Sequence, residues 1–230
     1  MRYLLIVACL IMVAGCVLAD DIVTMPTANQ LKAGEVDAAV YYLKLDAPKS
    51  APNPQHVNYQ TVYIGLTDRI ELDAHLAQVH RDRDSTVLVA SYKALSETKT
   101  LPDVVVGCRN LTGTQTTNHP VFKDRSKDRS YFIAGAKTFF ADKSKPGPPL
   151  VRAHLALGTQ DWTLLGEVRH RGVFGGLQFL FKPDFGAVAQ YDGQDMITGL
   201  TFMPKNTGLT IKGGSYGDHL WLGLSLRKAF

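Results

Sequence analysis

The chain has few cysteines: Cys9, Cys16 and Cys108 are the only three among its 230 residues. Cys9 and Cys16 lie in an apolar N-terminal stretch, which leaves Cys108 as the single thiol in the body of the chain. Neither an intrachain disulfide nor a cysteine-based metal site is therefore expected.

The chain also has no large excess of positive or negative charge. Lysine and arginine number 25 against 21 acidic residues, which gives a formal net charge of +4, and the basic residues are spread along the chain. A nucleic-acid-binding domain gathers its basic residues on one face or helix, so no nucleic-acid partner is expected. With 45% hydrophobic and 20% charged residues, the chain is too apolar for an intrinsically disordered protein.

Long apolar runs are missing after residue 19. A transmembrane helix needs about 18 or more consecutive apolar residues, and no later stretch keeps a 3.6-residue apolar period for three turns. Short segments rich in Val, Tyr, Phe, Leu and Thr instead alternate with clusters of Gly, Pro, Asn and Asp. This pattern predicts β-strands joined by turns.

The N-terminus has the pattern of a secretory signal peptide over residues 1–19. Arg2 supplies a positive charge, and an uncharged apolar run then ends at Ala19 before acidic residues. We favour cleavage by type I signal peptidase after Ala19. The reason is the membrane barrel argued below, because a protein embedded in the membrane needs no lipid anchor. A second cut competes, because residues 13–16 resemble a bacterial lipobox, which would leave Cys16 as a lipidated N-terminus.

Twelve later segments have strand character, and twelve is an even number. They cover residues 35–45, 60–66, 70–79, 86–95, 103–110, 130–140, 150–159, 175–181, 185–192, 195–203, 208–214 and 219–230.

Alternation within these segments separates an apolar face from a polar one. In the last segment the odd positions, such as His219 and Ser225, are polar or small for the most part. The even positions are apolar except Lys228, and we predict that they face lipid: Leu220, Leu222, Leu224, Leu226 and Phe230. Charged residues in strand centres must then point to the opposite side.

Two architectures accept this alternation: a water-soluble sandwich or barrel with an apolar interior, and an outer-membrane barrel with an apolar exterior and a polar lumen. Connection lengths favour the membrane barrel, whose loops are long at one end only. The short connections fall on one end, at 67–69, 182–184 and 205–207, and the long polar ones on the other, at 47–56, 111–129 and 160–173. Connections 96–101 and 141–149 are longish and blur this asymmetry.

We therefore expect an all-β chain with a signal peptide at 1–19, an N-terminal segment at 20–34 and a single antiparallel up-and-down transmembrane β-barrel of about twelve strands at 35–230. The final Phe230 resembles the C-terminal recognition pattern of bacterial outer-membrane barrels. The expected partners are outer-membrane lipid and the barrel-assembly machinery. The alternative is a secreted or lipid-tethered soluble β-domain that binds carbohydrate or protein through its long loops.

Three short motifs are similar to those of YjbH-like outer-membrane β-barrel proteins, which are associated with exopolysaccharide production. They are TMPTAN at 24–29, GLTDRIEL at 65–72 and KDRSY at 127–131, and Gly34 precedes the first strand. The resemblance implies a non-enzymatic barrel of the bacterial outer membrane, structural or transport-related, with polysaccharide as a further partner.

Catalytic motifs are largely absent. The sequence has no P-loop, no His-Glu-x-x-His and no dinucleotide-binding glycine fingerprint, so no cofactor, metal or enzymatic activity is expected. Residues 213–217 (GGSYG) fit G-x-S-x-G. A nucleophile elbow needs a helix after the serine, whereas a strand follows here, so we interpret the motif as a hairpin loop.

Charged strand residues are instead expected to form a network in the lumen, where opposite charges neutralise one another. The candidates are Glu71, Asp73, His75, Arg109, Arg152, His154, Lys212 and Arg227. Glu71 and Asp73 lie on one strand face about 7 Å apart, a spacing that suits inverting glycoside hydrolysis. We favour their pairing with an arginine or lysine of another strand.

Overall fold

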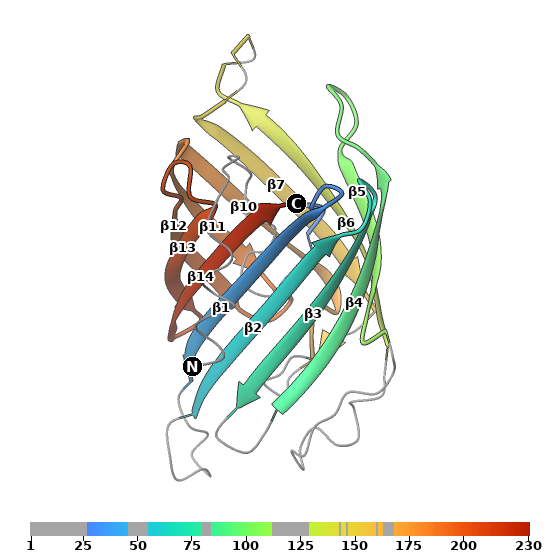
Figure 1. Ribbon diagram of the computed structural model, residues 1–230, viewed down its shortest axis with the longest axis vertical. Helices are drawn as coiled ribbons and strands as arrows, with labels where there is room; N and C mark the ends of the chain where they lie inside the picture. Colours follow the sequence, from blue (N-terminus) through green and yellow to red (C-terminus); the bar gives the residue numbers. More distant parts are fainter. Residues whose placement is uncertain are drawn as a thin grey trace.

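The protein is a closed barrel of twelve antiparallel strands (Figure 1). The computed structural model describes residues 27–45, 55–79, 84–111, 129–142, 144–145, 147–159, 161–162 and 168–230. The barrel strands are β1 (Glu35–Leu45), β2 (Gln55–Gly65), β3 (Ile70–Val79), β4 (Asp84–Leu95), β5 (Asp103–Arg109), β6 (Ser130–Phe140), β7 (Leu150–Gly158), β10 (Gly172–Lys182), β11 (Phe185–Tyr191), β12 (Met196–Phe202), β13 (Leu209–Tyr216) and β14 (His219–Ala229).

Each barrel strand pairs with its neighbours in the chain, which gives the up-and-down topology. The first and last strands close the barrel, with Glu35 of β1 opposite Ala229 of β14 and Leu43 opposite Trp221. Closure leaves no strand edge with unpaired backbone groups. The predicted all-β, twelve-stranded, antiparallel barrel is thus confirmed, and no helix in the described part of the chain is long and apolar enough to cross a membrane.

The predicted strand bounds lie within two residues of the structure except at the starts of β2 and β10. β2 starts at Gln55 rather than Gln60, because the residues before Gln60 still pair with β1. Leu45 of β1 lies opposite Gln55. β10 starts at Gly172 rather than Gly175 through pairing with β7. The connection between β7 and β10 also holds a small two-stranded sheet, β8 (Asp161–Trp162) and β9 (Val168–Arg169), which is too short for an alternation pattern to reveal.

The two ends of the barrel differ in their connections. The short connections 66–69, 183–184 and 203–208 join strands at the end where β1 starts and β14 finishes, which we call the short-turn end. The three long connections, 46–54, 110–129 and 159–171, join strands at the opposite end, which we call the loop end. The predicted asymmetry is nevertheless incomplete, because the loop end also holds the short connections 192–195 and 217–218 and the short-turn end holds the longer connections 96–102 and 141–149.

Strand alternation places a mixed polar and aromatic face inside the barrel and an aliphatic face outside. On β14 the inward side chain of Trp221 is 1% exposed, whereas Leu220, Leu222 and Leu224 are 70%, 63% and 50% exposed. Trp221 packs over Gly199 of β12, where an added Cβ would lie 2.7 Å from the indole ring. Its Nε1 donates hydrogen bonds of 3.2 Å to the carbonyl oxygens of Thr198 and Ser215.

Candidate functional site

The candidate residues of the charge network all lie on the inward face of the barrel wall. Their exposed fraction is 8% or less for seven of them and 9% for the side chain of Arg227. These residues are Glu71, Asp73, His75, Arg109, Arg152, His154, Lys212 and Arg227. They belong to β3, β5, β7, β13 and β14, so the interior of the barrel is the candidate functional site.

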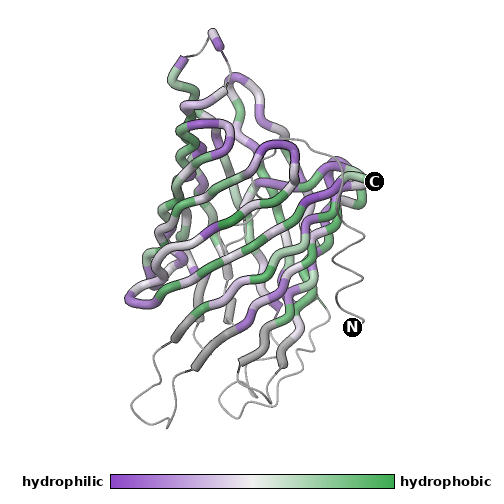
Figure 2. The backbone as a smooth tube through the Cα atoms, turned by 60° about the vertical axis from the view of Figure 1, so that its left-hand side comes forward, coloured by the Kyte–Doolittle hydropathy of each residue, from purple (hydrophilic) through white to green (hydrophobic). Residues whose placement is uncertain are grey.

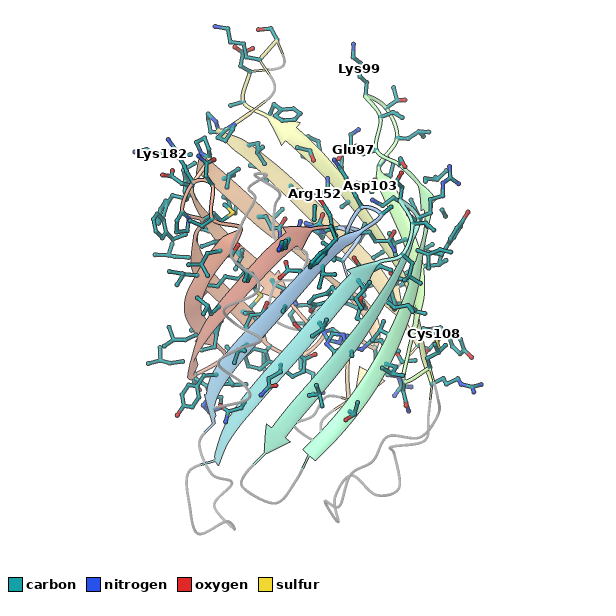
Figure 3. The ribbon with its side chains drawn as sticks, in the orientation of Figure 1. Glu97, Lys99, Asp103, Cys108, Arg152 and Lys182 are labelled. Atoms are coloured by element: carbon teal, nitrogen blue, oxygen red, sulfur yellow. The ribbon has the colours of Figure 1, made fainter. Side chains whose placement is uncertain are left out.

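Arg152 of β7 makes side-chain hydrogen bonds to four residues. Its Nη2 donates to Asp103 Oδ2 and its Nη1 to Glu97 Oε2, each at 2.6 Å. Nη1 also reaches Thr138 Oγ1 at 2.7 Å, and Nε donates to Asn29 Oδ1 at 2.7 Å. Figure 3 shows Glu97, Asp103 and Arg152 close together near the short-turn end. The guanidinium therefore ties three wall strands, the β4–β5 connection and the chain that precedes β1.

Glu71 and Asp73 were expected to pair with Arg109, Arg152, Lys212 or Arg227, and Arg152 is not bonded to either of them in the described part of the chain. The bonds of the guanidinium go to Asn29, Glu97, Asp103 and Thr138 instead. Burying an arginine is costly unless opposite charge and hydrogen bonds satisfy it. The carboxylates of Glu97 and Asp103 supply the opposite charge, and together with the neutral oxygens of Asn29 and Thr138 they accept the hydrogen bonds.

Glu97 lies in the connection between β4 and β5, outside the strands. Burial disfavours its charged form, but hydrogen bonds from the Thr138 backbone N–H, the Thr138 hydroxyl and Arg152 outweigh burial and hold the pKa of Glu97 below its usual value. Lys137 adds a second positive charge, with Nζ 3.6 Å from Glu97 Oε1, and the backbone N–H of Glu97 donates to Asp103 Oδ1 at 2.8 Å.

The stabilising effect of Glu97 is expected to depend on pH. Because its folded-state pKa is lowered, its bonds contribute fully above the unfolded pKa of about 4.3 and are lost as pH falls through the folded value. The drop in unfolding midpoint caused by Glu97→Gln should therefore be full at pH 7 and shrink below about pH 4. A drop of constant size between these pH values, measured by urea unfolding in detergent, would show that the charge of Glu97 is irrelevant.

Arg227 and Lys212 lie on a different part of the wall from Arg152. Arg227 Nη2 donates to Asp37 Oδ2 at 3.2 Å, and the two residues stand directly opposite each other on β14 and β1. Lys212 Nζ lies 5.9 Å from the centre of the Tyr41 ring. The predicted residues therefore form several local groups around the lumen.

Four of the remaining candidates line a small cavity in the lumen. Glu71, Asp73 and His75 of β3 and Arg109 of β5 line it together with Tyr63, and its volume is about 20 Å³, which is room for little more than one water molecule. The Nδ1 of His75 hydrogen-bonds the Tyr59 hydroxyl, and His154 Nε2 lies 3.1 Å from Gln178 Oε1. No group of metal-binding side chains occurs among the described residues.

Residues 27–34, which we call the N-terminal segment, also line this interior. Thr27, Ala28, Gln30 and Leu31 are at most 9% exposed, and Ala28 belongs to a buried cluster with Val87, Val89, Val105, Phe132, Ala134, Ala136, Ala156 and Phe174. The backbone N–H of Leu31 donates to Glu71 Oε2 at 2.7 Å. The described part of the expected segment 20–34 thus fills the barrel mouth, while the predicted signal peptide and Cys16 lie outside the described residues.

Sequence reasoning missed five partners of Arg152 and Arg227: Asp37, Glu97, Asp103, Asn29 and Thr138. Asp37 had a usable signal, because it alternates with Val36, Ala38 and Val40 on the first predicted strand. Asp103 begins a strand, and neither Glu97 nor Asn29 belongs to one, so no periodicity marks them as inward-facing.

The G-x-S-x-G motif is part of a strand and not of a nucleophile elbow. Ser215 belongs to β13, and its Oγ lies 2.9 Å from Thr198 Oγ1. The expected hairpin loop is shorter than predicted, because β13 continues to Tyr216 and the turn is made by Gly217, with φ of 54°, and Asp218.

Hydrophobic and hydrophilic residues follow one another along the strands (Figure 2), and the outward-facing side chains differ in kind between the strand ends and the strand centres. Among outward-facing strand side chains that the structure describes, only Lys137, Lys182 and Lys228 are charged, and all three lie near the short-turn end. Exposed outward aromatic residues lie near the strand ends: Tyr92, Phe139, Phe181, Phe185, Phe202 and Phe230 at the short-turn end, and Tyr42, Tyr131 and Tyr191 at the loop end. Aliphatic side chains occupy most of the band between them.

No family model matches the chain, and no curated protein matches it. Among solved structures, the KdgM porin is similar, with a TM-score of 0.51 and 10% identity over 85% of this chain and 99% of the porin chain. The N-terminal β-barrel domain of Pseudomonas aeruginosa OprF aligns over 86% of this chain and 100% of that domain, at 13% identity and a TM-score of 0.28. The likeness to the KdgM porin shows that this chain has a porin-like barrel fold.

Proposed function

We propose that the protein is a bacterial outer-membrane β-barrel that serves the cell envelope as a transport-related or structural component and has no enzymatic activity. The outer surface carries this proposal. An aliphatic band bounded by aromatic residues at both strand ends is the pattern of a barrel wall in contact with lipid. The buried charges of the lumen support the same arrangement, in which the polar face of each strand points inward and the apolar face points to lipid.

The short-turn end then faces the periplasm, because outer-membrane barrels have short periplasmic turns and longer outer loops. Both the start of β1 and the end of β14 lie at this end. Export through a signal peptide at 1–19 and insertion by the barrel-assembly machinery complete the proposed route. A soluble β-domain, the alternative, would leave residues such as Leu155, Leu200 and Leu222, 64%, 56% and 63% exposed, in water as one extended apolar surface.

Membrane fractionation tests the proposal. The protein, expressed with its own N-terminus, is expected in the outer-membrane fraction and should resist extraction by carbonate and urea. Recovery in the soluble periplasmic or culture fraction would favour the soluble β-domain and overturn the membrane assignment.

The resemblance of residues 65–72 and their neighbours to YjbH-like proteins extends the proposal to exopolysaccharide production or export. Residues 66–69 form the β2–β3 turn at the short-turn end, where the Thr67 hydroxyl accepts bonds from the backbone N–H groups of Arg69 and Ile70. Deletion of the gene should reduce secreted polysaccharide. Unchanged secretion would remove this extension and leave the barrel assignment intact.

A further inference from the structure

The N-terminal segment occupies the lumen without becoming part of the wall. Residues 27–33 contain no strand, and the segment joins β1 only at Glu35. Two of its apolar side chains, Ala28 and Leu31, are 0% and 1% exposed. The segment is therefore an insert in the barrel mouth, and the barrel closes around it through the pairing of β1 with β14.

Side chains of three wall strands hold this insert. Arg152 Nε of β7 donates to Asn29 Oδ1 at 2.7 Å, and Gln30 Nε2 donates to Ser91 Oγ of β4 at 2.6 Å. Glu71 of β3 accepts the backbone N–H of Leu31. These separate hydrogen bonds can break one at a time. Removing a barrel strand would instead break the backbone hydrogen bonds to both neighbouring strands, so the insert can leave more easily than a strand.

A fixed pivot lies at the base of the segment. Gly34, with φ of 77°, donates its N–H to the Gly65 carbonyl and accepts the N–H of Phe230, both at 2.9 Å. Gly65 lets the chain pass closely, because a Cβ there would lie 2.0 Å from the Lys32 carbonyl oxygen. The segment is thus tied to the wall at Gly34 by backbone bonds, and the residues that precede Gly34 contact the wall through hydrogen bonds to wall side chains and through the buried side chains of Ala28 and Leu31.

We propose that the N-terminal segment is a gate that closes the lumen at the short-turn end, and that Arg152, Ser91 and Glu71 form its latch. The proposal rests on the transport-related function proposed above and specifies how transport is regulated. In this structure the pocket that Thr27 and Asn29 line, together with Glu71 and other wall residues, has room for little more than one water. When residues 27–31 leave, Glu71, Ser91 and Arg152 line the vacated space beside the apolar cluster of Ala28, and these polar groups favour the entry of water and ions.

Single-channel conductance of the mature protein in planar lipid bilayers tests the gate. One net hydrogen bond corresponds to about a fivefold change in an equilibrium, so Gln30→Ala should raise the open fraction by about fivefold. The Asn29→Ala/Gln30→Ala double variant also loses a bond to a charged guanidinium, which is worth more than a neutral bond, and should raise the open fraction by about fiftyfold or more. Gln178→Ala is the matched control, since Gln178 is 8% exposed and bonds His154 and not the segment.

Chemical labelling gives a second readout that needs no current. Val89 is 3% exposed and shares the buried cluster of Ala28. In a Cys108→Ser background, Val89→Cys should react slowly with a water-soluble maleimide, about fivefold faster with Gln30→Ala added, and at the original rate with Gln178→Ala added.

The outcomes separate the gate from the barrel assignment. Equal conductance and equal labelling in wild type, the Gln30→Ala variant and the double variant would overturn the gate, even if the protein fractionates with the outer membrane. A parallel rise with Gln178→Ala would overturn it as well, because general loosening of the lumen would then explain the effect. Recovery of the protein in the soluble fraction would overturn both proposals.

Discussion

Replacing Arg152 with methionine is expected to lower the free energy of unfolding by about 3 to 5 kcal/mol, the usual loss when one partner of a buried ion pair is removed. Methionine fills much of the volume but leaves the Glu97 and Asp103 carboxylates without the guanidinium that bonds both at 2.6 Å. Urea unfolding of detergent-refolded protein measures the loss as a lower midpoint.

Two further variants separate charge from shape at this position. Arg152→Lys keeps the charge but lacks the planar fork that reaches four partners, so it should restore only part of the stability. Adding Glu97→Gln and Asp103→Asn to Arg152→Met removes the unpaired charges and should recover part of the loss. If Arg152→Met unfolds at the wild-type midpoint, the described bonds do not stabilise the barrel.

Leu224→Arg is expected to impair insertion and folding in lipid by about 2 to 4 kcal/mol, the cost of arginine on the lipid-facing surface near the bilayer midplane. Leu224 lies in the middle of β14 on the outward face and is 50% exposed. In a water-soluble protein the same substitution would place a charge in solvent and cost little. Folding yield into lipid vesicles and the urea midpoint of the folded fraction measure the effect.

Leu220→Arg is the matched control for Leu224→Arg. Leu220 lies on the same face of the same strand but near the loop end, and it is 70% exposed. Arginine near the membrane interface costs only about 0 to 1 kcal/mol. Equal losses for the two variants, or a larger loss for Leu220→Arg, would contradict the proposed depth of the strand in the membrane.

The strands were predictable from the sequence because each carries its own two-residue period. Residues 70–79 and 130–140 match β3 and β6 at both ends, since Gly, Pro or charged turn residues bound the alternating runs. The outward face of β14 was equally readable, because leucine occupies four successive even positions from 220 to 226. The lengths of the connections and the final Phe230 favour the barrel over a soluble sandwich, and the structure confirms the closure.

The partners inside the lumen were not predictable, because they depend on register and on residues outside the strands. Arg152 was recognised as inward-facing, but Thr138 becomes its neighbour only through the β6–β7 register, in which the two residues stand opposite. Glu97 and Asn29 reach the guanidinium from a connection and from the N-terminal segment. No periodic signal exists for such residues.

The N-terminal segment itself gave only a weak signal. Its apolar content is low, and its position in the lumen depends on bonds to Arg152, Ser91 and Glu71, which are 123, 61 and 40 residues away from their partners in the sequence. The glycines at its base, Gly34 and Gly65, were visible in the sequence, but their role in the close passage of the chain was not.

Heat modifiability of the mature protein tests the account most directly. A closed barrel keeps every strand paired and has no edge from which unfolding can spread. Protein refolded in detergent and loaded without boiling should therefore run as a compact species on a denaturing gel, and boiling should shift it to its full apparent mass. Identical mobility with and without boiling, for protein that stays soluble without detergent, would contradict the membrane barrel.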